Sequence, residues 1–148
     1  MKNTVSYKLF TLPLVKVFIW SEAAILLGIA RLLVWLLPFK YWVKLIGTPM
    51  SCRYDYQQVH IKPKNLLNIQ WAIKSAAYRV PWQAVCLPQA MTAKWMLNFR
   101  GQTSKLLLGL RPDPENNNKL AAHAWLECGS DIVIGEVDNK YTKITHFI

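Results

Sequence analysis

Apolar residues dominate the segment Leu9–Ile46, and prolines interrupt it at Pro13 and Pro38. Within it, Ala23–Leu37 carries leucines and alanines at the i, i+3 and i+4 spacing of a helix. Ser21, which is followed by an acidic residue, is a typical helix start. The pattern therefore predicts a helix over Ala23–Leu37 with almost no polar face.

This predicted helix is a poor candidate for a membrane span. About 20 apolar residues are needed to cross a bilayer, and a central arginine such as Arg31 costs roughly 2.5–3.5 kcal/mol on insertion. The segment also starts late and lacks the small-residue cleavage site of a signal peptide, so we expect it to be retained. We expect residues 1–48 to form an apolar helical segment that packs on the core or lies on a membrane surface.

Two further helices are predicted in the middle of the chain. Residues 49–64 are polar and contain prolines near both ends, which indicates a loop or linker. Asn65–Tyr78 places its apolar residues on one helical stripe. Pro88 is tolerated in a first helical turn, so Cys86 should lie at or just before the N-terminus of the next helix. That helix should continue until Gly101, a natural C-terminal cap.

After this helix the periodicity changes to short apolar runs of strand length. The turn Gly129-Ser130, with glycine first, suits a type II′ hairpin. Arg111–Lys119 is rich in proline, aspartate and asparagine and predicts a polar loop. The predicted strands are Ser104–Leu110, Leu120–Cys128, Asp131–Val137 and Tyr141–Phe147. The expected fold class is α+β, with N-terminal helices followed by an antiparallel sheet.

Composition fits a small packed domain of 148 residues, of which 53% are hydrophobic and 18% charged. It opposes intrinsic disorder and excludes a large multidomain enzyme. The formal net charge of +10 is unevenly placed: residues 1–112 hold 15 basic and 2 acidic residues, whereas residues 113–148 hold 3 basic and 6 acidic ones. A basic surface suits an anionic membrane, an acidic peptide or nucleic acid. No nucleic-acid-binding signature is found, so we expect no nucleic-acid partner.

The three cysteines, Cys52, Cys86 and Cys128, include no CxxC pair, so neither a disulfide framework nor a zinc site is predicted. His60 and His146 lack partners at metal-ligand spacing, and we expect no metal and no cofactor. Sparse cysteines favour a reducing, cytoplasmic setting. Cys128 precedes the hairpin turn, and we expect it to be a structural thiol.

One cysteine and one histidine have catalytic potential. The free N–H groups of a helix N-terminus favour a thiolate at Cys86. A nucleophilic cysteine also needs a base, and His123 lies on the first strand of the predicted hairpin. If that hairpin pairs Cys128 with Asp131, Glu136 lies across from His123 and can hold the imidazole in its useful tautomer. The alternative interpretation is a buried structural cysteine and a hydrogen-bonded core histidine.

The residues around this pair resemble those of a known family. The resemblance is to the transglutaminase-like cysteine protease domain of lasso-peptide maturation enzymes, in particular the stand-alone leader peptidase of the microcin J25-processing type. It covers about residues 22–148 and rests on Trp82-Gln-Ala-Val-Cys-Leu-Pro-Gln-Ala-Met, Ala122-His-Ala-Trp-Leu-Glu-Cys-Gly and Val133-Ile-Gly, in this order. It implies that residues 65–148 form a transglutaminase-like, papain-like catalytic core.

The resemblance also implies roles for individual residues. Cys86 matches the nucleophile and His123 the general base. The third member is an acidic residue on the next strand, for which Glu136 is the first choice and Asp138 and Asp131 are the alternatives. The residues expected to contact substrate are Trp125, Gln89 and Gly109. Trp125 either shields the imidazole or packs the core, and Gly109 either admits a substrate backbone or marks a bulge.

The activity implied is removal of the leader peptide from a ribosomally synthesised lasso-peptide precursor, a step of antibiotic biosynthesis that precedes macrolactam closure. The expected partners are the precursor peptide, the lasso cyclase and a separate leader-binding protein, a RiPP recognition element, because the chain resembles no such module. Two alternatives stay open. The same groups suit a transglutaminase-type acyltransferase, and the basic helical part suits a noncatalytic adaptor that binds a peptide or a membrane.

Overall fold

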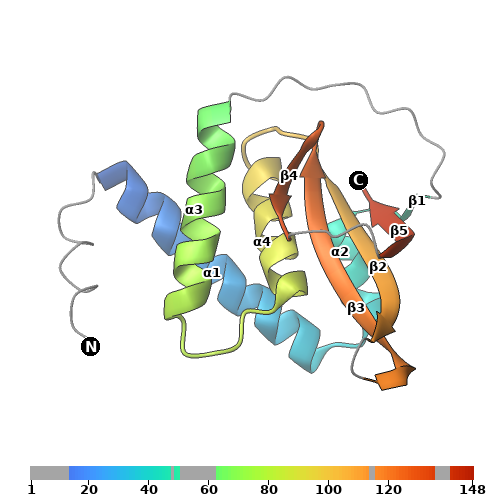
Figure 1. The fold of residues 1–148 in the computed structure, drawn as a ribbon. Helices are drawn as coiled ribbons and strands as arrows, with labels where there is room; N and C mark the ends of the chain where they lie inside the picture. The colour runs from blue at the N-terminus through green and yellow to red at the C-terminus, as the bar shows by residue number, and fades with distance from the viewer. Residues whose placement is uncertain (1–13, 48, 51–62, 114–115, 136–140) are drawn as a thin grey trace.

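A computed structural model describes residues 14–47, 49–50, 63–113, 116–135 and 141–148 (Figure 1). Its helices are α1 (Leu14–Leu36), α2 (Phe39–Ile46), α3 (Pro63–Arg79) and α4 (Cys86–Asn98). Its strands are β1 (Pro49–Met50), β2 (Lys105–Asp113), β3 (Asn116–Cys128), β4 (Asp131–Ile134) and β5 (Thr142–Phe147). The strands form one antiparallel sheet in the order β1-β5-β2-β3-β4. The predicted fold class is therefore confirmed.

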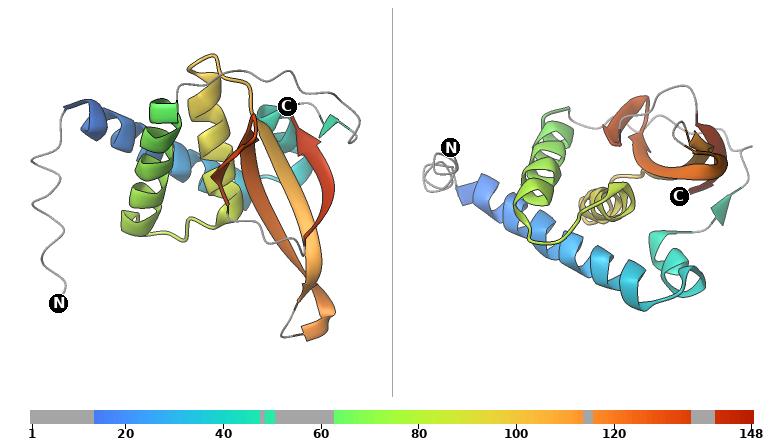
Figure 2. Two further views of the ribbon diagram at one scale, coloured as in Figure 1. Left: turned by 45° about the horizontal axis from the view of Figure 1, so that its top comes forward. Right: turned by 60° about the horizontal axis from the view of Figure 1, so that its bottom comes forward.

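Helix α4 lies at the centre of the molecule, with the sheet on one side and α1 and α3 on the other (Figure 2). Its sequence explains this position, because a helix that is apolar on nearly every side must be covered all round. The buried residues of α4 are Pro88, Ala90, Met91, Thr92, Ala93, Lys94, Met96 and Leu97. The first residue of α4, Cys86, is thus fixed by the best-packed element of the domain.

The N-terminal helix is longer than predicted. α1 begins at Leu14, directly after Pro13 in the sequence, so the predicted start at Ser21 is wrong. Ser21 lies inside the helix, where its hydroxyl donates to the Phe18 carbonyl oxygen at 2.8 Å instead of capping a new helix. The end is as predicted, because the residue before Pro38 disfavours helical geometry.

The hairpin of β2 and β3 extends through most of the predicted loop Arg111–Lys119. Pairing continues from Arg111 opposite Ala121 to Pro112 opposite Leu120. The guanidinium of Arg111 lies 4.7 Å from the Tyr141 ring, a contact between distant segments that local turn propensity does not reveal. The loop prediction is therefore wrong over most of its length.

The second hairpin turns where predicted. Gly129 has φ 63°, and among the described residues only glycines have a positive φ. A positive φ at the first turn residue and not at the second fits the type II′ turn over Gly129-Ser130. Its second strand is shorter than predicted, because β4 ends at Ile134 and Gly135 follows with φ 84°. Gly135 is a bend, and residues 136 and 137 of the predicted strand lie outside the described residues.

Gly135 provides a test of this bend. A Cβ at Gly135 would lie 2.7 Å from the Ala124 carbonyl oxygen and 2.7 Å from the Trp125 Cβ. We expect Gly135→Ala to lower the free energy of unfolding by about 3 kcal/mol, because steric overlap adds to the cost of a positive φ. Gly101 has φ 65° but no atom within 4 Å of the added Cβ, so Gly101→Ala should cost only about 1 kcal/mol. Urea unfolding measures both, and equal losses would contradict the packing argument.

Candidate active site

Cys86 is the first residue of α4, as predicted, and its side chain is half-buried. Val85 before it is extended, with φ −69° and ψ 176°, and makes no side-chain cap. Pro88 has no N–H, and the Gln89 N–H donates to the Val85 carbonyl oxygen at 3.3 Å. Within the described part of the chain, the backbone N–H groups of Cys86 and Leu87 have no hydrogen-bond acceptor. The helix start therefore offers two free donors beside the thiol.

The side chain of Gln89 bonds to its own chain. Its Nε2 donates to the Ala84 carbonyl oxygen at 2.5 Å, two residues before Cys86. This bond holds the backbone that leads into the helix. The structure thus gives Gln89 a role in positioning Cys86, whereas its predicted contact with substrate stays a prediction.

His123 lies on β3, where its ring has two aromatic neighbours. The Trp125 ring is stacked at 6.1 Å and the Tyr141 ring is tilted at 5.1 Å between centroids. Trp125 is fully buried, and its indole Nε1 donates to Glu127 Oε1 at 3.0 Å. Trp125 and His123 share one face of the strand, as predicted, and Glu127 orients the indole.

Gly109 explains how these rings fit together. It is the cross-strand partner of His123 on β2, and a Cβ there would lie 2.8 Å from the Trp125 ring. The pairing of β2 with β5 also shifts register between Leu108 and Gly109. Gly109 therefore makes room for Trp125 at a bulge, and this accounts for glycine without a substrate.

Cys86 and His123 lie on two elements that contact each other, α4 and β3. The segment after Asn98 leads to Lys105, which pairs with Glu127 on β3, so α4 and β3 run side by side in the same direction (Figure 1). From Asn98 back to Cys86 the helix spans about 18 Å. From Glu127 back to His123 the strand spans about 13 Å.

The side chain of His123 lies on the side of β3 that faces away from α4, the helix that Cys86 begins. Ala124 and Leu126 belong to the core that includes α4, so alternation places His123 and Trp125 on the other face. No hydrogen bond joins Cys86 to His123 among the residues that the structure describes. β4 ends opposite Leu126, so no β4 residue pairs with the His123 section of β3. The catalytic pairing of Cys86 with His123 stays a prediction. It requires the imidazole to reach Cys86 past the section of β3 that contains His123.

The register of the second hairpin affects the choice of the third catalytic residue. Cys128 pairs with Asp131, as predicted, but Leu126 pairs with Ile134 because the register shifts by one residue between them. The pairing that selected residue 136 as the partner of His123 is therefore already lost at Leu126. The bulge thus removes the register argument that selected Glu136.

The three acidic candidates differ in what is known of their positions. Glu136 and Asp138 lie outside the described residues, and their roles stay predictions. Asp131 is exposed at the hairpin turn, opposite Cys128 and five residues along β3 from His123. That separation is about 16 Å, too far for a hydrogen bond to the imidazole.

Cys128 is a buried thiol, which fits the predicted structural role. Its Sγ lies 3.0 Å from the Thr103 carbonyl oxygen, and burial, with Asp131 nearby, raises its pKa to about 11. A thiol with this pKa is a poor nucleophile at neutral pH. The half-buried Cys86 at a helix start is therefore the better candidate.

Lys94 is a buried cation in the middle of α4. Lys94 is 2% exposed, and its Nζ donates to the Ser104 carbonyl oxygen at 2.8 Å. Burial lowers its pKa to about 8 from 10.5, against an opposing effect of Cys128. Lys94 is thus still mostly charged in the folded state at neutral pH, but it loses its proton at a lower pH than in the unfolded chain.

The low pKa of Lys94 predicts a pH dependence of stability. Between about pH 8 and 10.5 the unfolded chain holds more protons than the folded one, so this group makes the folded state more stable as pH rises. Cys128, with its raised pKa, opposes the trend above pH 9.0. We therefore compare the wild type with Lys94→Met by urea unfolding. The wild type should gain roughly 2 kcal/mol on the variant between about pH 7 and pH 10. A constant difference would contradict the shift.

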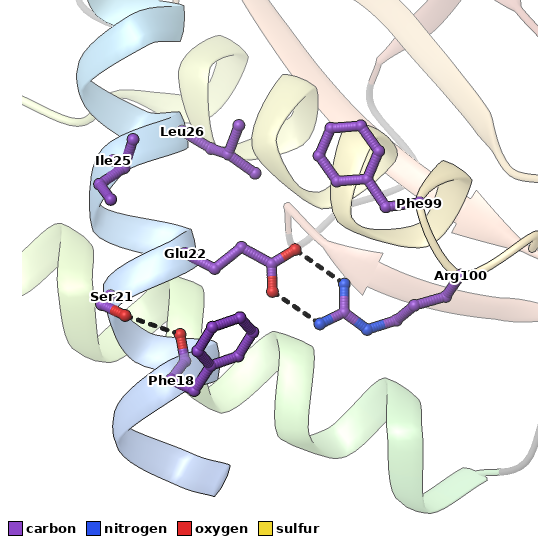
Figure 3. Close-up of a pocket in the computed structure, with 7 residues that line it drawn as sticks. All are labelled: Phe18, Ser21, Glu22, Ile25, Leu26, Phe99 and Arg100. Atoms are coloured by element: carbon purple, nitrogen blue, oxygen red, sulfur yellow. Dashed lines mark hydrogen bonds and ion pairs between the residues drawn. The ribbon is translucent and has the colours of Figure 1, made fainter. Parts of the chain in front are cut away.

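A surface pocket of ≈ 600 Å³ lies at the other end of α4 from Cys86 (Figure 3). Phe18, Ile25 and Phe99 contribute to its apolar lining. Glu22 and Arg100 form an ion pair at 2.6 Å beside them. The pocket is thus separate from the candidate catalytic residues. Among the described residues, no group of three His, Cys, Asp or Glu side chains is placed to hold a metal ion.

Sequence reasoning missed Tyr141 and Glu127 as neighbours of the histidine and tryptophan. Glu127 follows Trp125 by two positions, so strand alternation was a sufficient signal for it. Tyr141 is distant in sequence and reaches His123 because β5 pairs with β2, which no local signal reveals.

Comparison with known proteins identifies the family of this chain, in which Cys86 begins a helix and His123 lies on a strand. Residues 33–146 match the sequence profile of the transglutaminase-like superfamily. No curated protein and no solved structure shows a significant match. The match spans most of the chain, from the end of α1 to β5, and includes Cys86 and His123. The chain belongs to the transglutaminase-like superfamily.

Proposed function

We propose that this protein is a cysteine peptidase that removes the leader from a ribosomally synthesised lasso-peptide precursor. The superfamily includes cysteine peptidases and acyltransferases, so acyl chemistry at a cysteine is the general expectation. The finer assignment is supported by the Cys86-Leu-Pro-Gln-Ala and Ala122-His-Ala-Trp sequences, which resemble those of lasso-peptide leader peptidases.

The observation that carries the proposal is the position of Cys86 as the first residue of the central, buried helix α4. The first residue of a helix lies at the positive end of the helix dipole, which is a typical setting for a cysteine nucleophile. In this proposal the free N–H groups of Cys86 and Leu87 donate to the oxyanion that develops next to the sulfur. Gln89 keeps this turn in place through the Ala84 carbonyl.

The reaction follows from these groups. The Cys86 thiolate attacks the carbonyl carbon of the last leader residue, and a carbon–sulfur bond forms as the carbonyl oxygen becomes an oxyanion. When the carbon–nitrogen bond breaks, the His123 imidazolium gives its proton to the departing amine of the core peptide. Neutral His123 then takes a proton from water, whose oxygen displaces the thiolate and releases the leader acid.

In this scheme the substrate is brought by partners. We expect a separate leader-binding protein to deliver the precursor, and the lasso cyclase to use the amine that cleavage exposes. That free amine is the nucleophile which macrolactam closure requires. Leader removal must therefore precede ring closure.

The test is an incubation of the chain with a precursor peptide and its leader-binding protein, followed by mass spectrometry. Release of free leader acid supports hydrolysis, whereas attachment of the leader to an added primary amine would indicate an acyltransferase. An absence of both products with active partners would contradict the proposal. Single replacements Glu136→Gln and Asp138→Asn identify the acidic residue by which one slows release, and Asp131→Asn is the control because Asp131 lies too far from His123.

A further inference from the structure

Helix α1 carries an uncovered apolar stripe along its outward side. Its members recur at intervals of four and seven residues, which places them on one side of a helix. Their exposed fractions are 87% for Leu14, 70% for Phe18, 64% for Ile25, 54% for Leu32 and 63% for Leu36. We call these five residues the α1 stripe. Ser21 lies between Phe18 and Ile25 on this side, and the exposed apolar surface on either side of it marks an interaction site.

The opposite side of α1 is fixed in the domain. Ala23, Leu27 and Ala30 are fully buried and belong to the core, and α1 packs on α3 and α4 (Figure 2). By length and composition α1 is apolar enough to cross a membrane. A spanning orientation would pull these residues out of the core. With the fold intact, α1 can meet a membrane only by lying along its surface.

The charges of the helical layer favour an anionic surface. Lys40 and Lys44 are exposed on α2, which begins three residues after the last stripe residue, Leu36, and Arg31 is half-buried one position before Leu32 on α1. In the helices of the described chain the acidic residue is Glu22, which the Arg100 guanidinium neutralises through contacts of 2.9 and 2.6 Å. An apolar stripe with exposed cationic residues next to one end of it suits a helix that lies in the headgroup region of an anionic membrane.

The pocket of Figure 3 continues the α1 stripe. Phe18 and Ile25 belong to both, and Phe99, which is 69% exposed, forms the opposite wall. The volume of ≈ 600 Å³ is sufficient for part of an acyl chain. The polar groups beside it already satisfy each other in the Arg100–Glu22 ion pair. An apolar occupant therefore fits this hollow better than a charged one.

We propose that the α1 stripe docks the protein on an anionic lipid membrane, with α1 in the plane of the surface and an acyl chain in the adjoining pocket. A second copy is a weaker occupant, because chains with a net charge of +10 and cationic residues near the same surface repel each other. The membrane supplies both an apolar layer for the stripe and negative charge for the lysines. This docking does not depend on the chemistry at Cys86.

The test is flotation of the full chain with vesicles of phosphatidylcholine alone or of equal parts phosphatidylcholine and phosphatidylglycerol. The wild type should float with the anionic vesicles, less so at high salt. Ile25→Glu and Leu32→Glu should each weaken binding about tenfold or more, because a carboxylate replaces a buried apolar group. Ile144→Glu is the matched control on β5, where the side chain is 55% exposed, and should bind like the wild type.

Circular dichroism and melting confirm that each variant is folded before its binding is scored. Failure of the folded wild type to float with anionic vesicles would overturn the proposal. Equal binding by Leu32→Glu and the wild type would do the same. A concentration-dependent dimer in light scattering that Leu32→Glu dissociates, without vesicle binding, would show that a second copy covers the stripe instead.

Discussion

Cys86→Ala should reduce leader release by about a thousandfold or more while the protein stays folded. The change removes the nucleophile, and no other group at the start of α4 can form the acyl intermediate. Cys86 is half-buried, so losing its sulfur leaves only a small gap in the packing. The measurement is the initial rate of leader release by mass spectrometry at saturating precursor.

Cys128→Ala is the matched control for this result. Cys128 is 2% exposed and its pKa is raised to about 11, so it has no catalytic part. We expect this variant to be less stable but to release leader within a few-fold of the wild-type rate well below its melting temperature. If Cys128→Ala lost activity and Cys86→Ala kept it, the nucleophile would be assigned to the wrong cysteine.

The second large effect is expected for His123→Gln. Glutamine retains hydrogen-bonding capacity but cannot exchange a proton at neutral pH. The variant therefore loses two steps, the proton transfer to the core-peptide amine and the proton transfer from water. We expect the rate of leader release to fall by about a hundredfold to ten-thousandfold. The residual rate should also follow a pH profile that differs from that of the wild type.

His146→Gln is the control for a histidine on the same sheet. His146 is 8% exposed and pairs with Leu107 on β2, and burial lowers its pKa. Its replacement should affect stability more than turnover. A His123→Gln variant with the wild-type rate and pH profile would show that His123 is the packing residue of the alternative interpretation, held between Trp125 and Tyr141.

The features that could be predicted from sequence are those with local causes. Pro88 and Gly101 bound α4 because each has a strict backbone preference, and together they place Cys86 at the helix start. Gly129 likewise fixes the hairpin turn and the pairing of Cys128 with the residue after the turn. Backbone geometry at single positions therefore sufficed to locate the nucleophile.

The features that could not be predicted depend on distant contacts. The register shift after Leu126 has no local signal in the sequence, and it removes the pairing on which the choice of Glu136 rested. Ser21 was predicted to start a helix because serine is a common helix cap. Its hydroxyl instead donates to the Phe18 carbonyl, a partner that is in reach only once the helix has formed. The candidate nucleophile and base were thus identified from local sequence, whereas the orienting acid was not.

The central claim is that Cys86 carries the acyl group of the leader during turnover, and rapid acid quench followed by intact-protein mass spectrometry tests it most directly. With precursor and leader-binding protein present, the wild type should show an added mass equal to the leader acyl group. The adduct should map to the peptide that contains Cys86, be released by hydroxylamine as a thioester is, and be absent in Cys86→Ala. Leader release that proceeds without any adduct, and that persists in Cys86→Ala, would contradict the account.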